Sequence, residues 1–172
     1  ALGAAAADLL ASTIEGLVAI TGSAAYSEAS ARIGIAPDTI IDAADFEAIS
    51  TAATTASVAP IGIKDVAIAL AVAFTDAVTI FGGKLTTTGD ARIESGVDQT
   101  VNALADTNDL KGPCESVAVS VAISHSTAHV TDQADLKIGG KLRVTATTLD
   151  HNRTGARSAA GENGSVGVAL AV

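Results

Sequence analysis

The stretch DVAIALAVAFTDAVTIFGGKLTTTGDARIESGVDQTV, residues 65–101, decides the fold. In segment 66–74 every second residue is bulky and apolar, and the residues between are alanines. Such period-2 alternation is typical of a β-strand, whose successive side chains point to opposite faces. Alanine is a poor strand former and needs a packing reason to be there. We therefore expect the alanine face to lie against a closely packed second layer or another copy of the protein, through Ala67, Ala69, Ala71 and Ala73.

The same pattern recurs along the chain. SVAVSVAISHSTAHVTDQADLKIGGKLRVTATTLDHNRT, residues 116–154, follows 51 residues later, and SVGVALAV, residues 165–172, begins another copy after 49 more. At an offset of 51, Leu85 matches Leu136 and Arg92 matches Arg143. A weaker copy comes first, in which Ala31 matches Ala77, and the segment from Asp45 matches the one from Asp90, at offsets of 45 or 46. A period near 50 is typical of solenoids and other repeat architectures.

These repeats predict an all-β fold, namely an elongated β-solenoid resembling a parallel β-helix. We expect a segment over 1–16, a degenerate first repeat over 17–64, repeats over 65–115 and 116–164, and the start of a further one over 165–172, truncated or donated. The solenoid places Val66–Phe74 and Val117–Ile123 side by side, parallel and one coil apart. An antiparallel β-sandwich stays open, because Gly-Gly turns also form hairpins.

Two segments are compatible with helices as well as strands. Residues 1–16 combine helix-forming alanines with Leu9, Leu10 and Ile14 at helical spacing, and they end in Gly16. Residues 38–49 have similar spacing. A short N-terminal helix or degenerate repeat strands would both fit.

Composition limits the classes of partner. Of 172 residues, 48% are hydrophobic but only 2% aromatic, and the formal net charge is −9. This charge, without a basic stripe, argues against nucleic acid as a partner. The longest apolar run, Val66–Phe74, is far below the roughly 20 residues of a membrane-spanning helix, so we expect no membrane span. The single Cys114 excludes an internal disulfide.

Candidate metal ligands are sparse. His125 and His129 share one strand face but lie about 13 Å apart, and at an offset of 51 they replace Phe74 and Val78, which are packing positions. His151 falls in a polar turn. Three acidic groups could bind calcium weakly, but the G-G-x-G-x-D pattern of calcium-binding β-rolls is missing. These acidic groups are Asp132 with Asp135, Asp106 with Asp109, and Asp90 with Glu94. Apart from such weak calcium binding, we expect no cofactor.

The sequence contains the residue types of a catalytic triad, namely Ser116 or Ser126 with His125 and Asp132. No G-x-S-x-G sequence surrounds these serines, so we expect no enzyme. Two alternatives remain. One is a carbohydrate-active enzyme of the lyase or epimerase type, which would need clustered acids with Lys, Arg or His in a groove. The other is a β-sandwich binding module.

The steps Ala128-His129-Val130, Gly139-Gly140 and Leu142-Arg143-Val144-Thr145-Ala146 resemble the tandem repeats of very large bacterial surface and secreted proteins. Those are haemagglutinin-like adhesins and leukotoxin-like passengers. The resemblance covers residues 65–172 well and 17–64 poorly. It implies a structural, adhesive scaffold at the cell surface or outside the cell, and it transfers no catalytic residue.

The segment from Ser165 to Val172 carries no charged side chain. Exposed strand edges are usually protected by charge, proline or bulges. We therefore expect this strand to add to the sheet of a neighbour, so that copies of the chain, or adjoining repeats, join head to tail into a filament. The expected contact residues are the four alanines together with Val166, Val168, Leu170 and Val172.

Overall fold

The computed structural model describes residues 2–6, 8–14, 20–59, 61–62, 66–107, 114–158 and 165–172. All regular elements in these ranges are β-strands. In chain order they are β1 (Leu2–Ala6), β2 (Asp8–Ile14), β3 (Ile20–Ile35), β4 (Ile40–Ala43), β5 (Phe46–Val58), β6 (Ile61–Gly62), β7 (Val66–Phe81), β8 (Lys84–Thr87), β9 (Ala91–Thr107), β10 (Cys114–Val130), β11 (Asp135–Ile138), β12 (Leu142–Ser158) and β13 (Ser165–Ala171).

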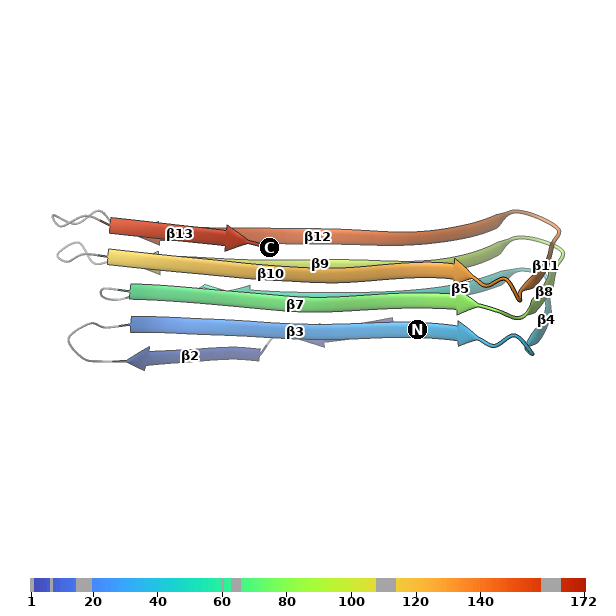
Figure 1. Ribbon diagram of the computed structural model, residues 1–172, viewed down its shortest axis with the longest axis horizontal. Coiled ribbons are helices and arrows are strands. Elements are labelled where there is room, and N and C mark those ends of the chain that lie inside the picture. Colours follow the sequence, from blue (N-terminus) through green and yellow to red (C-terminus); the bar gives the residue numbers. More distant parts are fainter. Residues whose placement is uncertain are drawn as a thin grey trace.

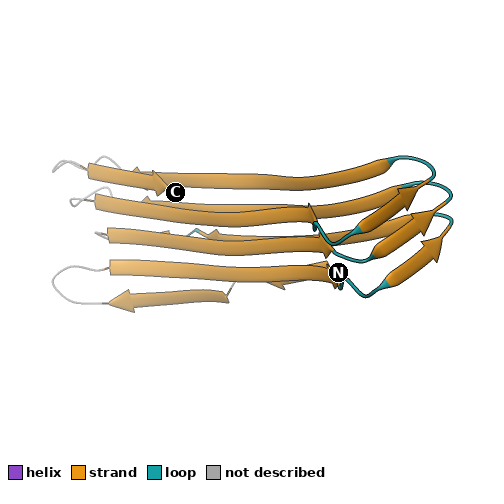
Figure 2. Ribbon diagram, turned by 45° about the vertical axis from the view of Figure 1, so that its right-hand side comes forward, coloured by secondary structure: helices purple, strands orange, loops and turns teal. Residues whose placement is uncertain are grey.

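The strands form three sheets that the chain visits in a repeating order (Figures 1 and 2). Sheet 1 has the order β13-β10-β7-β3-β2, sheet 2 the order β11-β8-β4, and sheet 3 the order β1-β5-β9-β12, with β6 also on β9. Each coil crosses all three: coil 1 is β3-β4-β5, coil 2 is β7-β8-β9 and coil 3 is β10-β11-β12. Successive coils pair in parallel. The β-solenoid prediction is confirmed, and the antiparallel sandwich is wrong.

For a given pair of coils, the register offset is constant along each pair of strands but differs between sheets. Coils 1 and 2 pair Ala31 with Ala77 and Phe46 with Ala91, at the expected offsets. Coils 2 and 3 keep the offset of 51 in sheets 2 and 3. In sheet 1, Val117 pairs with Ile68, an offset of 49.

The expected parallel neighbours 66–74 and 117–123 are therefore confirmed, but the constant offset of 51 is wrong in their sheet. The cause is the connection after the long strand, which is residues 82–83 in coil 2 and 131–134 in coil 3. A shift of two residues keeps every side chain on its face, because strand side chains alternate with period 2. For β13 the offset is 51, since Cys114 pairs with Ser165, and not the expected 49.

Of the two alternatives for the N-terminal segment, the helix is wrong over the described residues, which form strands. β1 pairs in parallel with β5, and β2 pairs antiparallel with β3. Segment 38–49 is also extended, in β4 and the start of β5. Local alanine propensity favours a helix only weakly. The edge of β5 instead offers backbone hydrogen-bond partners to β1, and the edge of β3 offers them to β2.

The interior is built from small side chains. Ala67, Ala69, Ala71 and Ala73 are completely buried, and they form one cluster with residues of sheet 3 such as Val101. The expectation that the alanine face meets a closely packed layer is confirmed, and that layer is the chain's own third sheet. Near sheet 2 the interior also holds larger side chains, namely Phe81, Leu85 and Ile93, in one cluster with Ala91.

Buried hydroxyl groups pair across the interior. Ser50 and Thr79 are joined by a hydrogen bond of 2.8 Å, and Ser95 and Ser126 by one of 2.7 Å. Each bond links sheet 3 to sheet 1. Buried polar groups must be paired to avoid a desolvation penalty, so these pairs fix how the two sheets face one another.

The turn between sheets 2 and 3 repeats one contact from coil to coil. The Asp45 carboxylate accepts the Asp90 N–H, and the Asp90 carboxylate accepts the Lys141 N–H, each at 2.8 Å. A side chain at Gly89 would collide with Asp45, and one at Gly140 would collide with Asp90. Glycine is needed at these positions because a carboxylate of the preceding coil occupies the space.

Candidate functional site

The outer surface of sheet 1 is apolar. Because the alanines point inward, the bulky residues between them point outward. We call the outward side chains of 66–74, 117–123 and 166–172, with Tyr26, the apolar face. Most of the exposed large hydrophobic side chains in the described residues lie on this side of sheet 1: Tyr26, Ile68, Leu70, Ile80, Ile123, Val166, Val168, Leu170 and Val172.

The outer surface of sheet 3 is polar by contrast. Arg92 bonds Glu47 at 2.9 Å and Glu94 at 2.8 Å, and Arg143 reaches Glu94 at 2.9 Å. This network links β5, β9 and β12, one strand from each coil. The two broad surfaces of the solenoid therefore differ in kind, one charged and the other apolar.

The end of the stack at coil 3 is open. β13 pairs with β10 only from Cys114 to Ser120, and the backbone of Val172 adds bonds to Ser120 and Ala122. Across the described residues, β11 and β12 have strand partners on one side only. Interior positions of coil 3 are therefore uncovered, and Leu142 and Val144 are 45% and 42% exposed.

The four expected contact residues of the last strand lie on the apolar face at this open end. Val166, Val168, Leu170 and Val172 are 51–67% exposed. The four alanines expected beside them lie instead in the core. Their side chains are covered by sheet 3, so none of their surface is left for a neighbouring copy.

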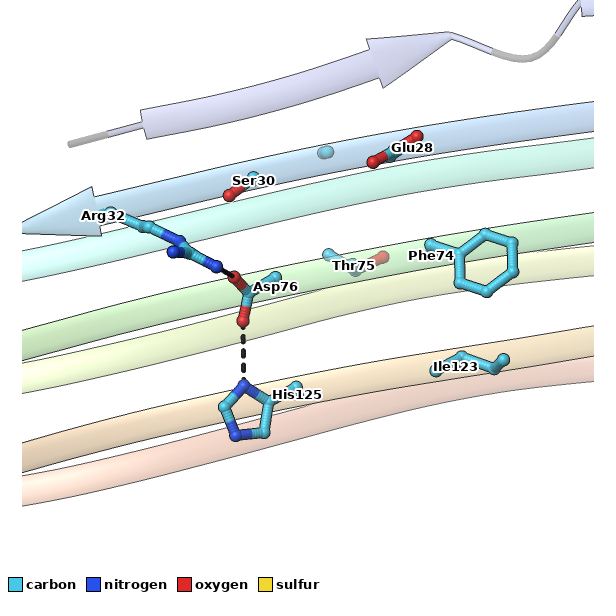
Figure 3. A pocket seen from close by; sticks show the side chains of 9 residues that line it. Glu28, Ser30, Arg32, Phe74, Thr75, Asp76, Ile123 and His125 are labelled. Atoms are coloured by element: carbon cyan, nitrogen blue, oxygen red, sulfur yellow. Dashed lines mark hydrogen bonds and ion pairs between the residues drawn. The ribbon is translucent and has the colours of Figure 1, made fainter.

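A row of polar side chains, Arg32, Asp76 and His125, crosses sheet 1 at one margin of the apolar face (Figure 3). The Asp76 carboxylate binds the Arg32 guanidinium at 2.7 Å and Nδ1 of His125 at 2.8 Å. His125 Nε2 also contacts the Thr127 hydroxyl at 2.9 Å. The hydrogen bond from His125, and then the hydrogen bond and the charge of Arg32, hold the pKa of Asp76 below its ordinary value, against the effect of partial burial.

This row borders a shallow pocket of about 360 Å³ that also includes Phe74 and Ile123. The row joins β3, β7 and β10, again one strand from each coil. Sequence reasoning missed it, because the offset of 51 placed His125 opposite Phe74. The observed register places His125 opposite Asp76 and His129 opposite Ile80, so the expected replacement of Phe74 and Val78 is wrong.

The hypothetical catalytic triad of Ser116 or Ser126 with His125 and Asp132 is not formed. Ser126 points inward and bonds Ser95, whereas His125, the preceding residue, points outward. Ser116 bonds Ser158 at 2.9 Å. Adjacent strand residues lie on opposite faces, so neither serine reaches the imidazole of His125.

The acidic groups considered for calcium have other partners or lie apart. Glu94 is held by two arginines, Asp135 lies 3.7 Å from Lys84, and Asp90 caps a backbone N–H. In the part of the chain that the structure describes, no three His, Cys, Asp or Glu side chains converge as metal ligands. Asp109 falls outside the described residues.

A second pocket, of about 380 Å³, lies at the turn into sheet 3. It is lined by Asp45, Phe46, Glu47, Asp90 and Arg92. Its acids are already engaged, two with backbone N–H groups of the next coil and one with Arg92. The arrangement stabilises the turn.

The chain matches no protein-family model, no curated protein and no solved structure. Within the described ranges there is no helix with the length and apolar character needed to cross a membrane. The functional argument therefore depends on the geometry and on the sequence itself.

Proposed function

We propose that the chain is a structural module of an elongated extracellular fibre or adhesin, in which further coils stack on coil 3 through open strand edges. One observation carries the proposal. Leu142 and Val144 occupy the register positions that Ala91 and Ile93 fill in coil 2. The coil 2 residues are completely buried, whereas those of coil 3 are almost half exposed.

The open end at coil 3 lacks backbone hydrogen-bond partners and a cover for its interior side chains, and a further coil would provide both. It would supply backbone partners to β12 and to the part of β10 beyond Ala122, and it would cover the exposed interior side chains. Strand addition at an open edge is a common mode of association, and a solenoid gains its continuous core from such stacking. The added coil can come from adjoining repeats of the same chain or from a second copy.

The resemblance to tandem repeats of bacterial surface proteins supports the adhesive and extracellular part of the proposal. The engagement of the acids and of His125 in contacts between coils supports a scaffold over an enzyme. The work of such a module is mechanical: it holds spacing and presents a surface.

The test places a charge on the open edge. Val144→Lys puts an inward-pointing cation where a stacked coil would lie, a device that natural edge strands use against pairing. Leu149→Lys is the matched control, because Leu149 lies on the same strand, is 49% exposed and points outward. By electron microscopy and sedimentation velocity, we expect the intact chain and the control to form end-to-end assemblies at high concentration.

Val144→Lys should remain short, and deletion of Val166–Val172 should leave a soluble species unable to polymerise. The proposal fails if the intact chain is a stable monomer at high concentration. It also fails if the truncated chain builds fibres with the same repeat length.

A further inference from the structure

The apolar face is large and nearly free of charge. Along β7 its outward residues are all bulky and apolar from Val66 to Phe74, and the outward residues 117–123 of β10 and 166–172 of β13 continue the same rows. Among the described side chains, the polar and charged groups of sheet 1 lie at the margins of the face, with Glu115 at one end and Glu28, Asp76 and His125 at the other. Contiguous exposed apolar patches of this kind mark interaction sites.

From these observations we infer that the apolar face is the surface through which two copies of the solenoid associate side by side, sheet 1 against sheet 1. The inference deepens the proposed structural function and rests on it. It adds lateral pairing to end-to-end stacking, and it assigns the two kinds of contact to different surfaces of the molecule.

The size of the face fits a reversible pair. It spans nine residues on β7 and seven each on β10 and β13, with Tyr26 on β3. At about 3.3 Å per residue and about 4.8 Å per strand, its flat footprint is on the order of 380 Å² per copy. Two copies would then cover on the order of 760 Å², which lies in the range of weak, transient contacts and not of permanent ones.

The corrugation of the face points to a copy as its occupant. Like side chains repeat from coil to coil at the strand spacing, as in the row Leu70, Val119 and Leu170. A second sheet 1 has the same spacing, so ridges and grooves can stay matched over every coil when the sheets pack about 10 Å apart. The long strands are nearly straight, so the face is extended along its whole length (Figure 1).

The distribution of charge is compatible with the same occupant. Each copy carries a net charge of −9, so two copies repel one another over most orientations. Pairing through sheet 1 keeps the charged outer surfaces of the two third sheets on opposite sides of the assembly. No charged group of either sign lies among the outward residues of 66–74, 117–123 and 166–172, so the contact itself brings no like charges together.

The experiment compares two substitutions with the same chemistry on opposite surfaces. Ile123→Glu lies on the apolar face and Leu149→Glu on the outer surface of sheet 3. The two residues belong to coil 3 and are 50% and 49% exposed, and each substitution adds one negative charge. The association of each full-length variant is measured by sedimentation equilibrium, and its fold by circular dichroism.

We expect Ile123→Glu to raise the dissociation constant of the pair at least about tenfold, because a carboxylate would lose its hydration in the interface. Leu149→Glu should have no effect on pairing. Higher salt should strengthen pairing of the intact chain by screening the repulsion between copies. If Ile123→Glu fails to fold, the double substitution Val119→Thr with Val168→Thr, which keeps β-branched side chains, must show the same weakening.

Val144→Lys distinguishes lateral pairing from end-to-end stacking. Because it blocks the stack and leaves the apolar face intact, it should still pair. Unpaired, single-width assemblies of the intact chain that Ile123→Glu leaves unchanged would overturn the lateral contact but not the stacking function. Equal weakening by both Glu variants would also overturn it. So would flotation of the intact chain, but not of Ile123→Glu, with phosphatidylcholine vesicles, since the face would then bind lipid.

Discussion

Gly89 and Gly140 each make room for a carboxylate from the coil below. A methyl group at Gly89 would collide with Asp45 and approach the carbonyl oxygen of Ala44 to 3.0 Å. The carboxylate would have to move, and the Asp90 N–H would lose its acceptor. The glycine is therefore required by its neighbour in the preceding coil.

We predict that Gly89→Ala lowers the free energy of unfolding by about 1–3 kcal/mol, through overpacking and a lost hydrogen bond. Urea unfolding measures the loss. Gly96→Ala is the control, because its nearest neighbour, the Thr51 methyl, lies 4.0 Å away. The control should be neutral or stabilising by up to about 1 kcal/mol. In the Asp45→Ala background the cost of Gly89→Ala should shrink, and an unchanged cost would contradict the proposed collision.

Asp76 makes the stability depend on pH. Its pKa is lower in the folded chain than in the unfolded one, because His125 and Arg32 favour the carboxylate. A lowered pKa contributes stability that is present above the unfolded value and is lost as pH falls through the folded value. Asp76 is only partly exposed, at 26%, but its partners are largely exposed, so the contribution should stay within the roughly 1 kcal/mol of exposed ion pairs.

We predict that Asp76→Asn destabilises the chain at neutral pH, and that the difference from the unmodified chain disappears between about pH 5 and pH 2. Urea unfolding across this range is the measurement. Asp98→Asn, at an exposed position on the outer surface of sheet 3, serves as the control. A destabilisation by Asp76→Asn that stays constant at all pH values would contradict the electrostatic explanation.

At the scale of the element, the two faces of β7 require side chains of different size. Its inward face is alanine because sheet 3 approaches closely, and its outward face is bulky. Replacing Ala71 by Leu should therefore cost about 1–3 kcal/mol through overpacking. Ala24→Leu is the matched control: the same atoms are added to an outward position of β3, in the row that contains Leu70. Thermal unfolding should show a loss for Ala71→Leu and little change for Ala24→Leu.

The strands and their parallel stacking were predictable because period-2 alternation and recurrence near 50 residues both lie in the sequence. The register in sheet 1 was not predictable. No sequence signal in residues 131–134 shows that this connection is two residues longer than the corresponding connection Gly82-Gly83. The choice between helix and strand at the N-terminus stayed open for a related reason. Alanine propensity is local, whereas the edges of β3 and β5 that hold β1 and β2 exist only in the folded molecule.

For the candidate site, too, features that depend on the local sequence pattern were predictable, and features that depend on the register of the folded chain were not. That Val166, Val168, Leu170 and Val172 share one face of their strand was predictable from alternation alone. The row Arg32-Asp76-His125 was not, because it depends on a register that differs by two residues from the apparent repeat. The inward direction of the four alanines was one of two options, and close packing against sheet 3 decided between them.

At the scale of the whole molecule, the solenoid is a thin slab with unlike sides. Sheet 3 carries the Glu47-Arg92-Glu94-Arg143 network, and sheet 1 carries the apolar face. The network keeps one side hydrated and leaves the other available for contact. Together with the open edge at coil 3, this gives the molecule two directions in which it can be extended, along the stack and across it.

The aspartate contacts of the turns also have a direction. Asp45 serves coil 2 and Asp90 serves coil 3, but the position after Gly140 is Lys141, which offers no carboxylate to a coil above it. A junction formed on coil 3 would therefore lack a charge-assisted hydrogen bond worth about 1.5–3 kcal/mol. Under tension along its axis, an array of such units would separate first at these junctions, and the coils within each unit would remain together.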